Sequence, residues 1–83
     1  MEERIHTVLT KEFNPSELVV FDDSESHRGH GGWREGGGTH FNVKIRAEAF
    51  AGLSRVAAQR LVMKALKAEF DDGLHALALD VAA

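Results

Sequence analysis

The sequence predicts an α+β fold, a single domain over residues 1–83 in which helices cover one face of a three-stranded mixed sheet. Three observations support this prediction. A chain of 83 residues is long enough for one domain and not for two. Apolar residues recur at helical spacing in some stretches and alternate as in strands in others. The stretches follow the order helix, strand, strand, helical turn, helix, strand, and one sheet with its helices buries their apolar faces economically.

The first part of the chain contains a helix and a strand. Over residues 2–13 the apolar side chains lie on one helical face, and Glu2 and Glu3 suit the N-terminal end of a helix dipole. The run Asn14-Pro15-Ser16 ends this helix. Residues 18–21 form a short apolar run with β-branched members, which is typical of a strand.

Residues 24–38 are expected to form a long Gly/His-rich loop. The stretch from Asp23 to Gly38 holds six of the eight glycines, two histidines and the only tryptophan. Glycine loses the most backbone entropy on ordering, and a stretch with this many glycines therefore opposes regular structure. Loops of this length are often functional.

A second strand and a long helix follow. Residues 39–46 alternate, with Phe41, Val43 and Ile45 on one face and polar residues, His40 among them, on the other. Residues 48–52 are expected to form a short turn, and Ser54 is a suitable N-cap for a helix that reaches about Phe70. The apolar stripe predicted for this helix consists of Val56, Met63, Leu66 and Phe70, widened by Ala57, Leu61 and Ala65.

The last predicted element is a strand. Gly73 is a natural residue after a helix end. Residues 74–81 alternate again, and the pattern places His75, Leu77, Leu79 and Val81 on one face.

Composition excludes several classes of protein. The chain has no cysteine, so it provides no disulfide, no thiol nucleophile and no thiolate metal ligand of its own. The net charge of −3 argues weakly against non-specific nucleic-acid binding. We expect a cytoplasmic protein without membrane contact, because no apolar run approaches ~18 residues and no signal-peptide core is present. No nucleophile–base set, phosphate loop or carboxylate pair stands out, so we expect neither an enzyme nor a small-molecule substrate.

Four motifs, in this order, resemble those of the BolA family. They are Glu25-Ser26-His27-Arg28-Gly29-His30, Gly37-Gly38-Thr39-His40-Phe41-Asn42-Val43, Phe50-Ala51-Gly52 and Leu74-His75-Ala76-Leu77-Ala78-Leu79. Together they extend over most of the chain at nearly the family's spacing. The family usually carries an Arg-His-Arg triplet early in its long helix, and the matching residues here are Ala58-Gln59-Arg60, so only the arginine is retained.

The resemblance implies a fold similar to class II KH domains and a monothiol glutaredoxin as partner. Such a heterodimer would share a 2Fe-2S cluster, with thiolates from glutaredoxin and glutathione, and would act in cluster trafficking or in iron or redox regulation. The ligands carried over to this chain are His75 and, from the loop, His30, with His27 as the alternative. No cofactor is then expected in the isolated protein.

Other residues have more than one interpretation. Trp33 is either a partner contact or a side chain that folds back onto the sheet. Arg60, Lys64 and Lys67 recur at i, i+4 and i+7, which indicates a solvated basic stripe, a contact for glutaredoxin or glutathione, or a phosphate-binding surface.

Two alternative functions remain open at this point. A nucleic-acid-binding transcriptional regulator would use the KH-like fold and the basic helix, although residues 50–54 lack the second glycine of a KH Gly-x-x-Gly loop. An autonomous site for zinc, nickel or copper would use His27, His30 and His40 with Asp22 or Asp23. For His40 by itself we expect a surface position or a helix contact, and for His6 a surface position.

Overall fold

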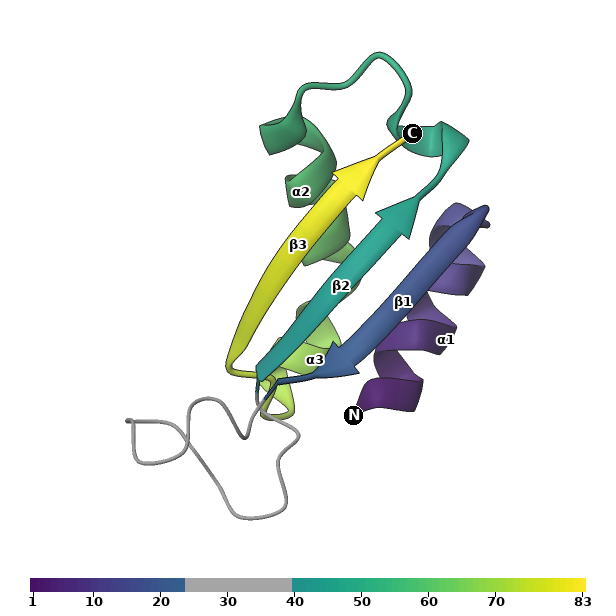
Figure 1. Ribbon diagram of the computed structural model, residues 1–83. Coiled ribbons are helices and arrows are strands. Elements are labelled where there is room, and N and C mark those ends of the chain that lie inside the picture. Colours follow the sequence, from purple (N-terminus) through teal and green to yellow (C-terminus); the bar gives the residue numbers. More distant parts are fainter. Residues whose placement is uncertain (24–39) are drawn as a thin grey trace.

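A computed structural model describes residues 1–23 and 40–83 of the chain (Figure 1). The elements are α1 (Glu2–Phe13), β1 (Glu17–Asp22), β2 (His40–Arg46), the 3-10 helix η2 (Glu48–Phe50), α2 (Arg55–Ala65), α3 (Lys67–Asp71) and β3 (Ala76–Ala82). The predicted loop at 24–38 lies outside the described residues.

The three strands form one mixed sheet in the order β1-β2-β3. β1 pairs antiparallel with β2, and β2 pairs parallel with β3, with Val43 opposite both Val20 and Leu79. The helices lie on one face of this sheet and leave the other face open (Figure 1). The α+β prediction, with its mixed sheet and helices on one face, is therefore confirmed.

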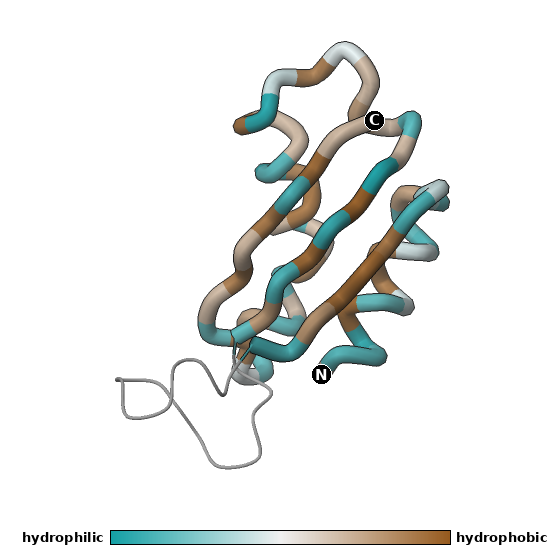
Figure 2. Tube along the Cα trace, in the orientation of Figure 1, coloured by the Kyte–Doolittle hydropathy of each residue, from teal (hydrophilic) through white to brown (hydrophobic). Residues whose placement is uncertain are grey.

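The core lies between the central strand and the helices. Phe41, Val43 and Ile45 of β2 are buried, and the side chains between them are exposed or half-exposed, which appears as alternating bands along β2 in Figure 2. The helices contribute Ile5 and Leu9 from α1 and Ala58, Val62 and Leu66 from the segment after Ser54. Because β2 has a strand on each side, its apolar face is the middle of the core.

The long helix differs from the prediction in two ways. It is interrupted at Leu66 (φ −98°, ψ 17°), which separates α2 from α3. The predicted stripe is also wrong in part, because Val56 is 54% exposed and Leu61 and Met63 are exposed as well. The buried positions of α2 are Ala58 and Val62. Apolar residues occur on both sides of this helix, so spacing alone does not show which side faces the sheet.

The final strand begins later than predicted. Leu74 N donates a hydrogen bond to Glu69 O (3.0 Å), so this residue is still held by the end of α3, and its side chain is buried in the core. Strand pairing starts at Ala76. His75 therefore lies before the strand and is exposed, instead of continuing the face of Leu77.

Candidate functional site

Two histidines meet at one end of the sheet. His40 is the first residue of β2 and pairs in register with Ala76, the first residue of β3. His75 immediately precedes that strand, so the parallel pairing brings both imidazoles to the same end. Their ring centroids are 5.3 Å apart and the ring planes are inclined by 56°.

The two histidines differ in burial. His75 is exposed, whereas His40 is only 6% exposed. For His40 we expected a surface position or a helix contact; the surface position is wrong, and the helix contact stays a prediction. The backbone of His40 is held as well, because Asp23 N donates to His40 O (2.8 Å) and continues the β1–β2 pairing past Asp22.

The segment that contains His27, His30 and Trp33 lies outside the described residues, but its two ends are fixed. Asp23 and His40, which flank it, are joined by the hydrogen bond just described. The chain therefore leaves and rejoins the described structure beside His75. His30 is seven residues from Asp23, and an extended residue spans about 3.3–3.6 Å, so chain length does not prevent the loop histidine from reaching His75.

A network of ion pairs supports the segment that carries His75. Arg4 Nη2 of α1 lies 3.0 Å from Glu69 Oε2 and 2.8 Å from Asp72 Oδ2. Hydrogen bonds to Asp72 and then Glu69 raise the pKa of the Arg4 guanidinium above its usual value. Glu69 is 4% exposed, so its charge needs this partner. The network attaches α1 to the end of α3, three residues before His75.

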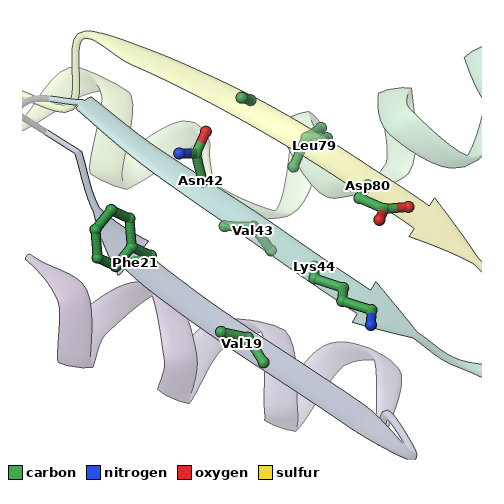
Figure 3. Close-up of a pocket in the computed structure, with 8 residues that line it drawn as sticks. Val19, Phe21, Asn42, Val43, Lys44, Leu79 and Asp80 are labelled. Carbon is green, nitrogen blue, oxygen red and sulfur yellow. The ribbon is translucent and has the colours of Figure 1, made fainter. Parts of the chain in front are cut away.

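The open face of the sheet carries two adjoining depressions. One, of about 180 Å³, lies beside the histidines and is lined by Asp23, His40 and residues of β2 and β3. The other, of about 310 Å³, runs along the middle of the sheet between Phe21 and Asp80 (Figure 3). Asn42 and Ala78 line both, so the two form one continuous surface. Phe21 is 57% exposed there, and Val19, which lines the same depression, is 51% exposed.

The predicted basic stripe is interrupted. Arg60 and Lys64 are exposed on α2, but Lys67 lies beyond the break, on α3. Lys67 Nζ also pairs with Asp71 Oδ2 at 3.1 Å. The three side chains therefore do not form one uniform cationic surface.

The described residues contain no group of three or more histidines, aspartates or glutamates placed to hold a metal ion. The autonomous site predicted from the loop histidines is thus not completed by Asp22, Asp23 and His40 within the described ranges. Nor does the described part of the chain contain a helix with the length and apolarity needed to cross a membrane.

The contact between His40 and His75 was not predicted. Its signal was present in the sequence, because both histidines stand at the start of strand-like stretches. Recognising it required the parallel pairing of β2 and β3, which aligns the starts of the two strands.

A family model described as "BolA-like protein" matches residues 9–83. The chain belongs to the BolA-like family. It is 46% identical over 78 residues to Protein BOLA1, chloroplastic, of Arabidopsis thaliana, covering 92% of this chain and 49% of that protein. It thus spans about half the length of that relative.

Two further BolA-like proteins bear on structure and function. The BolA domain of SufE1 from Arabidopsis thaliana superposes with a TM-score of 0.87 at 42% identity, covering 98% of this chain and 88% of that one. A protein of Vibrio cholerae named DNA-binding transcriptional regulator BolA is 37% identical over 79 residues, covering 95% of this chain and 71% of that protein. Because one relative is named chloroplastic, the cytoplasmic location of this chain stays a prediction.

Proposed function

We propose that this BolA-like protein acts without catalysing a reaction, by binding a monothiol glutaredoxin and donating His75 to a 2Fe-2S cluster that the two proteins share. The role would be cluster trafficking or iron or redox regulation. The observation that carries the proposal is an exposed imidazole at the end of the sheet, close to Asp23 and His40, which flank the histidine-containing segment 24–39.

The donor chemistry fits a shared cluster and does not fit a cluster held by this chain alone. Iron–sulfur clusters are bound mainly by cysteine thiolates, and this chain has no cysteine. Thiolates from glutaredoxin and glutathione would supply those ligands. This protein would add His75 and a loop histidine, His30 or alternatively His27.

Histidine ligands would determine the reduction potential and the pH sensitivity of such a site. When bound, the cluster supplies electron transfer and a transferable iron–sulfur unit. Replacing thiolate by imidazole raises the reduction potential of a cluster. Imidazole also accepts a proton near neutral pH, so its attachment to iron is sensitive to acidification. A mixed ligand set is therefore easier to dismantle than one of thiolates, which suits transfer or sensing.

Several further side chains would contact the glutaredoxin. The depression beside His40 and His75 adjoins the exposed Phe21, and aromatic side chains are favoured in protein interfaces. Arg60 and Lys64 are exposed on α2 and would pair with carboxylates of the partner or of glutathione. Lys67 would do so only by exchanging its pair with Asp71, and Trp33 remains a predicted contact.

The test is a titration of this protein into cluster-loaded monothiol glutaredoxin with glutathione, followed by visible absorption and circular dichroism. We expect a spectral change that saturates at one equivalent. His75→Ala and His30→Ala should alter the final spectrum or weaken binding at least tenfold, whereas His6→Ala on α1 should match the wild type. If only His27→Ala has an effect, the loop ligand is His27. No spectral change with any monothiol glutaredoxin would overturn the proposal.

A second candidate function is DNA binding, which the name of the Vibrio cholerae relative supports. In this chain Arg60 and Lys64 of α2 would meet phosphates. The net charge of −3 and the pairing of Lys67 with Asp71 weigh against it. DNA binding driven by phosphates weakens steeply as salt rises, because counterions are released. Binding to duplex DNA that is unchanged in R60Q/K64Q would exclude this surface.

A further inference from the structure

We propose that the free protein forms a homodimer in which the outer edge of β3 pairs antiparallel with β3 of a second copy. β3 (Ala76–Ala82) is the last strand of the sheet and has a neighbouring strand, β2, on one side only (Figure 1). Pairing of the two edges would join the sheets of both copies into one continuous sheet. This inference does not depend on the proposed function, because it concerns contacts between copies of this chain alone.

The backbone groups at this edge follow from the pairing of β3 with β2. Ala47 N donates to Ala82 O (3.1 Å), so the carbonyl of Ala82 points toward β2. Successive residues of a strand direct their N–H and C=O groups to opposite sides. The groups of Leu77, Leu79 and Val81 therefore point away from β2, and no strand in the described part of the chain pairs with them. Such an edge is a template for another strand.

An antiparallel pairing centred on Leu79 would satisfy these groups in both copies. Leu79 would lie opposite Leu79 of the second copy, and Leu77 opposite Val81 of the second copy. In an antiparallel ladder every second pair exchanges two hydrogen bonds, and the outward-pointing residues of both strands coincide at those positions. Their side chains are half-buried and pack against the core, so the two copies would cover one another on the helix side of the sheet.

The charge on β3 is compatible with this register. Asp80 is the only charged residue of the strand, and its carboxylate is paired with Arg46 Nη2 at 3.0 Å. In the register centred on Leu79, Asp80 lies opposite the exposed Ala78 of the second copy and not opposite a second aspartate. β3 also has no proline or lysine, two residues that commonly keep edge strands from pairing.

The other edge of the sheet is less suited to self-pairing. The equivalent pairing of two copies through β1, centred on Val20, would place Glu17 opposite Asp23 of the second copy, and like charges that lie opposite each other are destabilising. Glu2 and Glu3 of α1 line the groove beside Val20 and would add to this repulsion. The contrast between the two edges therefore favours β3.

α2 provides apolar surface next to the β3 edge. This helix packs against β3 and runs antiparallel to it (Figure 1). Val56 and Met63 are both exposed and lie seven residues, or about two turns, apart on one flank. Because the helix is right-handed and faces the sheet through Ala58 and Val62, this flank points away from α1, toward the side where the second copy would lie. Partial burial of this flank would stabilise the dimer.

The experiment is sedimentation equilibrium of the full-length protein over a wide range of concentrations. We expect a reversible shift from the mass of one chain to that of two. Ala78→Asp would set like charges opposite each other twice in each dimer, so it should raise the dissociation constant about tenfold. Ala78→Lys would set a lysine opposite Asp80 and should lower the dissociation constant. The matched control is Val19→Asp, an exposed position on β1, which should leave it unchanged.

Ala78 is exposed, so both substitutions should preserve the fold, which the amide spectrum checks. A protein that stays monomeric at every concentration would overturn the proposal. So would a dimer in which Ala78→Asp and Ala78→Lys change the dissociation constant in the same direction, or one that is weakened by Val19→Asp.

Amide hydrogen exchange gives an independent measurement of the same interface. The N–H groups of Leu77, Leu79 and Val81 should exchange more slowly as the dimer forms, because they become hydrogen-bonded. A dimer in which these three amides exchange as in the monomer would overturn the proposal. None of these outcomes bears on glutaredoxin binding.

Discussion

The position of His75 follows from its immediate neighbours. Gly73 has φ 121°, a backbone conformation that residues other than glycine rarely adopt. It turns the chain out of α3. Leu74 then enters the core, which leaves His75 exposed before Ala76 starts to pair. Alternation in the sequence suggested that His75 shared the face of Leu77. That prediction failed because residues 74 and 75 are not yet in the strand.

A substitution of Arg4 tests whether its ion pairs hold the end of α3 in place. Replacing Arg4 by methionine leaves the carboxylate of Glu69 buried without its partner, and Glu69 Oε1 already has no hydrogen-bond partner among the described residues. We expect Arg4→Met to lower the urea midpoint of unfolding clearly. The matched control is Lys67→Met, because that exposed i,i+4 pair is worth only about 0.3–0.5 kcal/mol. Equal effects of the two substitutions would contradict this role for Glu69.

At the level of elements, the strands were predictable and the orientation of the long helix was not. Period-2 alternation located β2 because its two faces differ in polarity from Phe41 to Arg46. The α2 sequence has apolar residues all round, with Val56 and Met63 exposed and Ala58 and Val62 buried. The buried side of α2 thus includes the small Ala58, while larger apolar side chains are exposed, and apolar spacing alone does not distinguish these two sides.

Two identical substitutions in α2 test its orientation. Val62 is fully buried, so Val62→Ala should lower the free energy of unfolding by about 2 kcal/mol through lost burial and a residual cavity. Val56→Ala removes the same atoms from an exposed position, where alanine is the better helix former, so its effect should lie within about 0.5 kcal/mol of zero. Chemical denaturation of both variants measures the difference. A larger loss in Val56→Ala would show that the sequence-predicted stripe was correct.

For the whole molecule, the sequence predicted the architecture, but it did not predict the contact between the two histidines at the candidate site. Element order, strand number and mixed sheet followed from periodicity and from the resemblance to the BolA family. The meeting of His40 with His75 depends on a contact between residues 35 positions apart, created by parallel pairing. No local pattern encodes that contact. The loop histidines remain predictions, because residues 24–39 lie outside the described structure.

The parallel pairing also makes the two ends of the sheet different. The histidine pair and both ends of the loop lie at one end of the sheet, while Arg46 at the other end of β2 pairs with Asp80. A partner that reaches His75 would therefore lie close to Asp23 and His40, which flank the segment 24–39. Partner binding and cluster ligation would be coupled at that end of the molecule.

The central claim is that this chain places a histidine directly on iron. The most direct measurement is pulsed electron paramagnetic resonance of the reduced cluster in the complex, with ¹⁵N-histidine in this protein and unlabelled glutaredoxin. We predict a ¹⁵N hyperfine coupling typical of a directly bound imidazole, and its loss or reduction in His75→Ala. A complex that forms with an intact cluster but shows no ¹⁵N coupling would contradict the claim.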